Sequence, residues 1–179
     1  MGAFPVLLLA DPVQPSLGAG LTMNDVAEFL AYAIKLEEDA ASRFSDLAES
    51  MKTYGNREVA EFFGKMAHFS RLHLAEARKR AGFHKLPDMK PEDFVWPGDE
   101  SPEATSMEGS HYLMTTEYAL ALALDSEERG FAFYENVAKT TNDSEIRMMA
   151  EEFAEEEAEH VAELKKWVSR FGAPTPTSA

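Results

Sequence analysis

Cysteine is the most informative absence from this chain of 179 residues, which contains none. A chain without cysteine forms no disulfide, and it lacks the thiolate ligands of structural zinc sites, rubredoxin-type iron sites and iron–sulfur clusters. A cysteine nucleophile is excluded for the same reason. The absence also fits a reducing compartment, so we expect a cytoplasmic protein.

Basic residues are scarce as well, because 17 Lys and Arg stand against 32 Asp and Glu, and the net charge is −15. A nucleic-acid-binding face needs a cluster of basic residues that this sequence does not provide, so we expect no nucleic-acid partner. The acidity is explained either by a solvated surface or by a field that concentrates cations. No apolar run approaches the roughly 20 residues of a membrane helix, and we expect no membrane span.

The two ends of the chain differ in composition from its middle. The first twenty residues are rich in proline and glycine, and two prolines lie close to the C-terminus. We therefore predict a flexible tail over residues 1–22, a folded domain over 23–172 and a second tail over 173–179. Met23 is a candidate for the natural start of the protein.

Four segments between these tails repeat apolar residues at the spacing of a helix. They cover approximately residues 24–52, 57–81, 110–140 and 145–171. The connection over 84–109 contains four prolines and is long for a loop within one domain. Such a connection can run the length of a bundle, so we predict an all-α four-helix bundle of two helix pairs joined by a long crossover. Phe94, Val95 and Trp96 are expected to hold the crossover on the bundle.

The two predicted helix pairs resemble each other, as expected of a duplication. The segment His73-Leu74-Ala75-Glu76 aligns with His160-Val161-Ala162-Glu163. Glutamates lie seven residues before an aromatic residue in the first helix of each pair, at Glu37 and Glu127.

Each predicted helix carries an ionisable residue in the middle of its apolar face, and these residues are Glu37, His73, Glu127 and the pair Glu157 and His160. A lone buried histidine is usually a hydrogen-bonded core residue, and a lone acid usually lies at a bend or an interface. Four helices with such groups at similar depth favour a metal site, because isolated buried charges cost several kcal/mol each. A Glu and a His spaced three apart on a helix can reach one cation. Oxygen and imidazole ligands suit iron or manganese, and zinc is an alternative.

This spacing, the paired halves and the crossover resemble the ferritin-like superfamily, and specifically the rubrerythrin di-iron domain, over about residues 24–170. The resemblance implies a ferritin-like four-helix bundle. It also implies that the single glutamates of the two halves and the residues of the Glu-x-x-His motifs are metal ligands, with a tyrosine close to them. The residues that match this pattern are Glu37, His73, Glu127, Glu157 and His160 as ligands, and Tyr134 as their neighbour.

The sequence departs from the family pattern at two positions. Ser70 stands where the first Glu-x-x-His motif would have its glutamate, and Gly130 stands where many rubrerythrins carry a further glutamate. Other acids could substitute, although we expect each of them at the surface: Glu38, Glu76, Glu92, Glu100, Glu103 and Glu108. His68 lies off the apolar face and is expected to be structural.

The resemblance implies a non-haem iron protein with two ions, or with one ion on Glu127, Glu157 and His160. It also implies peroxide reduction or ferroxidase chemistry, and a homodimer. Because the cysteine-bound rubredoxin domain of longer rubrerythrins is missing, turnover would need an external electron donor. Two alternatives are metal binding or sequestration without turnover, and a structural bundle with a decayed site.

Overall fold

The structure is a computed structural model that describes residues 22–97, 101–103 and 115–171. These residues form four long α-helices and one short 3₁₀ turn, without any β-strand, which confirms the predicted all-α class. In the described part of the chain, no helix is apolar over a length that could cross a membrane. The elements are α1 (Val26–Thr53), α2 (Arg57–Ala81), η1 (Pro91–Asp93), α3 (Thr116–Thr140) and α4 (Ser144–Phe171).

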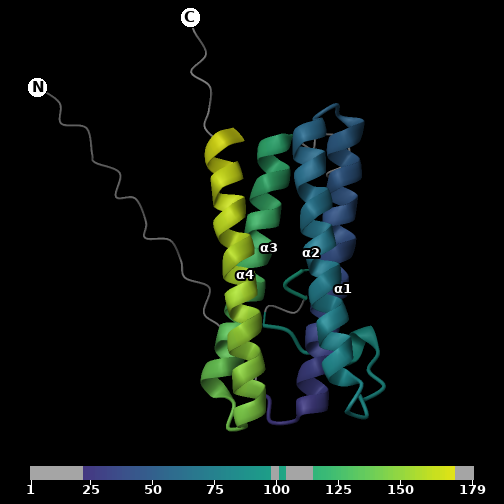
Figure 1. The fold of residues 1–179 in the computed structure, drawn as a ribbon, viewed down its shortest axis with the longest axis vertical. Coiled ribbons are helices and arrows are strands. Elements are labelled where there is room, and N and C mark those ends of the chain that lie inside the picture. The colour runs from purple at the N-terminus through teal and green to yellow at the C-terminus, as the bar shows by residue number, and fades with distance from the viewer. Residues whose placement is uncertain (1–21, 98–100, 104–114, 172–179) are drawn as a thin grey trace, which may run out of the picture.

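The helices form two antiparallel pairs, α1 with α2 and α3 with α4, which lie side by side along the long axis (Figure 1). The colours of Figure 1 show that α2 ends at the bottom of the view and that α3 begins at the top. The crossover therefore runs the length of the bundle, and α3 is parallel to α2. This confirms the predicted bundle of two helix pairs. The predicted tails lie almost wholly outside the described residues, as do parts of the crossover.

Two helices start later than the sequence predicts. The N-cap of α1 is Asp25, whereas the helix was expected from about residue 24, and its carboxylate accepts a hydrogen bond of 2.9 Å from a backbone N–H of the first turn. The predicted start of the third helix at Ser110 lies outside the described residues, whereas the structure places the N-cap of α3 at Thr115. The Thr115 hydroxyl accepts a hydrogen bond of 3.2 Å from the backbone of Tyr118, as expected of an N-cap threonine.

The apolar interior is divided into two clusters along the bundle axis. One cluster contains Phe29, Tyr32, Phe133 and Phe153 among others, and lies where α1 and α4 begin and α3 ends. The other cluster contains Phe44, Phe63, Leu120 and Leu164 among others, and lies where α1 and α4 end and α2 and α3 begin. Buried polar side chains lie between these clusters, and we call them the polar layer: Glu37, Arg43, Ser70, Glu103, Glu127, Glu157 and His160, with the partly buried His73.

Along the middle of α3, small residues face the interior, while larger apolar residues beside them do not. Leu124 and Phe131 are only partly buried, whereas Ala123 and Gly130 are fully inside. Small residues therefore line the centre of this face. They leave room beside α3 for side chains from other elements.

The crossover is held on the bundle by aromatic packing around Tyr32. Phe94 and Trp96 make edge-to-face contacts with the Tyr32 ring at 5.0 and 4.8 Å. The backbone N–H of Val95 donates a hydrogen bond of 2.8 Å to the Tyr32 hydroxyl, while the Val95 side chain is exposed. The prediction that these residues hold the crossover is confirmed for Phe94 and Trp96, whereas the Val95 side chain points to solvent and only its backbone takes part.

Candidate metal centre

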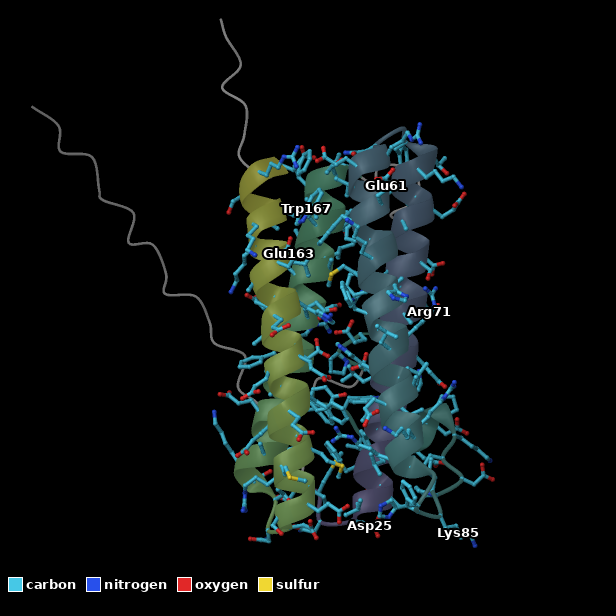
Figure 2. The ribbon with its side chains drawn as sticks, viewed as in Figure 1. Asp25, Glu61, Arg71, Lys85, Glu163 and Trp167 are labelled. Atoms are coloured by element: carbon cyan, nitrogen blue, oxygen red, sulfur yellow. The ribbon has the colours of Figure 1, made fainter. Side chains whose placement is uncertain are left out.

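The polar layer lies near the middle of the bundle, where both helix pairs contribute. Figure 2 shows oxygen and nitrogen atoms gathered between the two pairs at mid-height, with apolar side chains above and below. An α-helix places residues three and four apart on one face, so each helix brings its central polar residue to this level. Four elements thus deliver ionisable groups to one small volume.

The second helix pair provides the tighter group. The His160 ring nitrogen Nδ1 lies 3.1 Å from Glu127 Oε2 and 3.8 Å from Glu157 Oε2. Glu127, Glu157 and His160 are all buried, and each offers one ligand atom within 4.8 Å of the others. Among the described residues, this is the group whose spacing allows three protein ligands on one metal ion.

The first helix pair contributes a looser group. His73 Nδ1 lies 4.0 Å from Glu37 Oε2, and it lies 3.8 Å from Glu156 Oε2 on α4. Ser70 is fully buried, and its hydroxyl donates a hydrogen bond of 3.2 Å to the backbone carbonyl of Met66. The hydroxyl therefore bonds to the backbone of its own helix, and position 70 supplies no carboxylate to the layer.

The two groups meet through their histidines. The rings of His73 and His160 stack with centroids 5.1 Å apart and an interplanar angle of 13°. The structure thus brings all five ligand candidates to one level of the bundle. The tight group contains three of them, and Glu37 and His73 face it from the other helix pair.

Two further charged residues lie in the polar layer: Arg43, which the sequence analysis did not select, and Glu103, which it named only as one of several possible substitutes. Glu103 was expected at the surface, but only 1% of it is exposed, so that expectation is wrong. Arg43 forms an ion pair with the Glu103 carboxylate, and its Nη2 lies 3.6 Å from Glu127 Oε1. Of the other proposed substitutes, Glu38 and Glu92 are exposed and Glu76 is partly exposed, while Glu100 and Glu108 lie outside the described residues.

A sequence signal for Arg43 did exist. It lies on the helical repeat of Leu36, Ala40 and Leu47, all of which are buried, so it interrupts an apolar stripe. Glu103 gave no comparable signal because it lies in an irregular segment without periodicity.

Burial and mutual repulsion shift the pKa values of the acids in the layer. Burial raises the pKa of Glu157 and of Glu37 well above the usual value, and the negative charge of Glu127 raises both further. Burial also raises the pKa of Glu103 to about 8, although the Arg43 guanidinium opposes the rise. For Glu127 burial is outweighed by the hydrogen bond with His160, so its pKa is lowered. Glu127 is therefore the carboxylate that ionises most readily.

The two histidines are shifted in opposite directions. Burial, together with the neighbouring His160, lowers the pKa of His73 to about 4, so His73 is neutral near pH 7. Burial also acts to lower the pKa of His160, but the hydrogen bond with Glu127 outweighs it and the pKa is raised. A neutral imidazole is the form that binds metals, so His160 must release a proton when it becomes a ligand.

Tyr134, the predicted neighbour of the ligands, is fully buried between Phe29, Phe133 and Phe153. Its hydroxyl makes no hydrogen bond to the described residues. Burial raises its pKa, and the charge of Glu37 contributes to the rise. The hydroxyl is therefore close enough to the layer to respond to its charge.

The donors of the polar layer fit a metal ion such as iron. His73 Nδ1 and Glu103 Oε1 are buried and have no hydrogen-bond partner among the described residues. Buried polar atoms of this kind are rare in proteins, and coordination to a cation would satisfy such atoms. Carboxylate and imidazole donors suit iron, manganese or zinc.

A groove of about 570 Å³ between α2 and α4 reaches this layer, where its lining includes His73 and His160. The rings of Phe62 and Trp167 stack at 4.3 Å and border the upper part of the groove. Figure 2 labels Trp167 on the upper part of α4. The groove gives small molecules a route to the histidines.

The sequence and the fold both match known proteins. A family model described as Rubrerythrin matches residues 28–85 and 119–176. The two matched stretches cover most of both helix pairs and omit residues 86–118, which include most of the crossover.

The crystal structure of an uncharacterized conserved protein from Magnetospirillum magnetotacticum MS-1 has a similar fold, with a TM-score of 0.72 and 38% sequence identity. The comparison covers 87% of this chain and 99% of that chain. A search of curated proteins finds no match.

Proposed function

Because the chain belongs to the rubrerythrin family, we propose that it is a non-haem iron protein that reduces hydrogen peroxide at a pair of ferrous ions. The tight group of Glu127, Glu157 and His160 carries this proposal, because its ligand atoms lie within 4.8 Å of one another in a buried site. Glu37 and His73 face it from the other helix pair and provide donors for a second ion.

Two bound ferrous ions would supply the two electrons that, with two protons, convert one hydrogen peroxide molecule to two water molecules. The residues of the layer would serve this reaction by holding the two ions. In metal-free protein the raised pKa values of Glu37 and Glu157 keep protons on these carboxyls to higher pH than usual, and binding of the ions would release them. The groove beside His73 admits the small oxidant.

Each reaction cycle removes electrons that must be replaced from outside. The chain has no cysteine, so it contains no thiolate-bound iron centre that could pass electrons internally. We therefore include an external electron donor in the proposal, and a homodimeric assembly by analogy with the family.

A second candidate function is metal sequestration without turnover. Ser70 removes a carboxylate from the first helix pair, and Arg43 places a positive charge beside Glu127. Both features reduce the negative charge available to a pair of cations. They favour a single ion on Glu127, Glu157 and His160.

Anaerobic titration of metal-free protein with ferrous iron, followed by addition of peroxide, separates the two functions. If the protein is a peroxidase, it should bind two irons per chain and consume one peroxide for each iron pair. One iron per chain with no consumption of peroxide would support sequestration instead. The variant Glu155→Gln is a matched control, because Glu155 is an exposed glutamate on α4.

A further inference from the structure

Glu103 lies on the crossover, outside the stretches that match the family model, yet its side chain enters the polar layer. Ser101, two residues earlier, is also buried at 5% exposure, so this part of the crossover is inserted into the bundle. An ionisable side chain buried to this degree needs compensation by a counter-charge or a metal.

Arg43 compensates only part of this carboxylate. Its guanidinium forms an ion pair with Glu103 Oε2, and its Nη1 donates a hydrogen bond of 3.2 Å to the Glu103 backbone carbonyl. The other carboxylate oxygen, Oε1, has no hydrogen-bond partner among the described residues. One oxygen is thus anchored, while the other remains available to a ligand.

The available oxygen faces α3 at Gly130. A Cβ atom added to Gly130 would lie 3.1 Å from Glu103 Oε1 and 3.5 Å from the carboxyl carbon of Glu157. Gly130 follows Glu127 by three residues, so it lies on the same face of α3. The Glu103 carboxylate therefore occupies the space into which a side chain at position 130 would project.

We propose that Glu103 is a metal ligand supplied by the crossover, in place of a carboxylate that α3 lacks at Gly130. The proposal rests on the proposed function, because it requires that the polar layer binds iron. Oε1 of Glu103 binds an ion beside Glu157, whose carboxyl group borders the same space at Gly130. Arg43 is a positioning residue that fixes the orientation of the Glu103 carboxylate.

The competing explanation is that Glu103 only fastens the crossover to α1 through Arg43. The two roles predict different measurements. A fastening residue changes the stability of metal-free protein and leaves the iron affinity of the folded protein unchanged. A ligand changes the iron affinity of protein that is already folded.

The test is ferrous iron binding under anaerobic conditions, measured by competition with a chromophoric chelator, with circular dichroism to confirm folding. Glu103→Gln should weaken iron binding by about tenfold or more, since it removes a charged donor. Glu92→Gln is the control, because Glu92 is an exposed glutamate of the same crossover and should leave the affinity unchanged.

Glu103→Gln leaves Arg43 buried without its partner, so this variant is at risk of unfolding. The double variant Arg43→Gln/Glu103→Gln removes both charges and should fold, while losing iron affinity to a similar extent. The variant Glu103→Ala/Gly130→Glu moves the carboxylate from the crossover to α3. It should regain most of the affinity that Glu103→Ala loses.

Each outcome decides between the roles. Unchanged iron affinity in the folded double variant, or no recovery on moving the carboxylate to position 130, would overturn the ligand role and leave the proposed function standing. No iron binding by the wild-type chain would overturn both. Loss of affinity with recovery in the transfer variant supports the ligand role.

Discussion

The two helix pairs carry related sequences but build unequal halves of the polar layer. In the α3–α4 pair, His160 Nδ1 lies 3.1 Å from Glu127, and Glu157 completes a group of three ligand atoms. In the α1–α2 pair, His73 Nδ1 lies 4.0 Å from Glu37, and Ser70 bonds to its own backbone. A related helical framework therefore holds three donors in one half and two in the other.

The helical framework and the set of metal-ligand residues can therefore differ independently of each other. Helical spacing fixes the level at which each side chain enters, so both halves place their polar residues at mid-height. The identity of each residue then decides whether the site gains a donor. The first pair has lost one carboxylate, and it contributes Arg43 to the same layer.

Removing one carboxylate from each half gives the largest expected contrast. Glu157→Gln should reduce iron binding about 100-fold and leave less than one ion per chain, because it dismantles the group of three ligands. Glu37→Gln should leave one ion bound to the other half. The measurement is iron per chain after anaerobic gel filtration, with Glu155→Gln as the matched control.

Equal losses in Glu157→Gln and Glu37→Gln would contradict the inequality of the two halves. Such a result would mean that both carboxylates bind the same ions with similar strength.

The free energy of unfolding of metal-free protein should decrease as the pH rises, because the buried acids of the layer then lose their protons. The folded-state pKa of Glu103 is raised to about 8, and those of Glu37 and Glu157 are also raised, so between pH 6.5 and 8 the folded protein retains protons that the unfolded chain has lost. The free energy of unfolding should therefore fall by about 1–3 kcal/mol for each pH unit of increase. His73, with its pKa lowered to about 4, contributes stability that is lost only as the pH falls below about 6.5.

Urea denaturation across this pH range measures the slope. Glu157→Gln should flatten it, since the variant removes one of the raised groups, whereas Glu155→Gln should retain it. A wild-type stability that rises from pH 6.5 to 8 would contradict the assigned pKa directions.

Restoring the missing carboxylate should reduce the inequality of the halves. Ser70→Glu places a glutamate three residues before His73, and it should tighten binding of the second iron by about tenfold. The same change should lower the stability of metal-free protein by about 1–3 kcal/mol, because Ser70 is 1% exposed in a packed interior. Ser70→Gln is the control of equal size, and it should destabilise without tightening iron binding.

The smallest effect is expected at the mouth of the groove. Glu156 is only partly buried, and its carboxylate lies 3.8 Å from His73. Glu156→Gln should slow ferrous iron uptake by about threefold at low salt, and the difference should shrink as salt rises, because electrostatic steering is screened. Stopped-flow uptake at two ionic strengths measures this, and a salt-independent difference would exclude steering as its cause.

The sequence predicted the parts of the fold and site that depend on periodicity. The helix pairs, their long connection and the depth of Glu37, His73, Glu127, Glu157 and His160 follow from steps of three and four residues. Each of these residues lies on a long helix, where one position determines the direction of its neighbours.

The remaining features depend on tertiary contacts without a local signature. Glu103 lies in an irregular segment, and only the space beside Gly130 explains why its carboxylate is buried. Arg43 interrupts an apolar stripe, but the stripe alone does not reveal the partner that compensates its charge. The centre of the inner face of α3 has a weak sequence signal, because the small residues Ala123 and Gly130 are less apolar than Leu124 and Phe131.

The ion pair between Arg43 and Glu103 bears on how the chain folds while it is being synthesised. Both residues precede α3, so a ribosome completes them before Glu127, Glu157 and His160 emerge. The nascent chain can therefore pair Arg43 with Glu103 before the second helix pair emerges. Arg43 then has a counter-charge while α3 and α4 are still being synthesised.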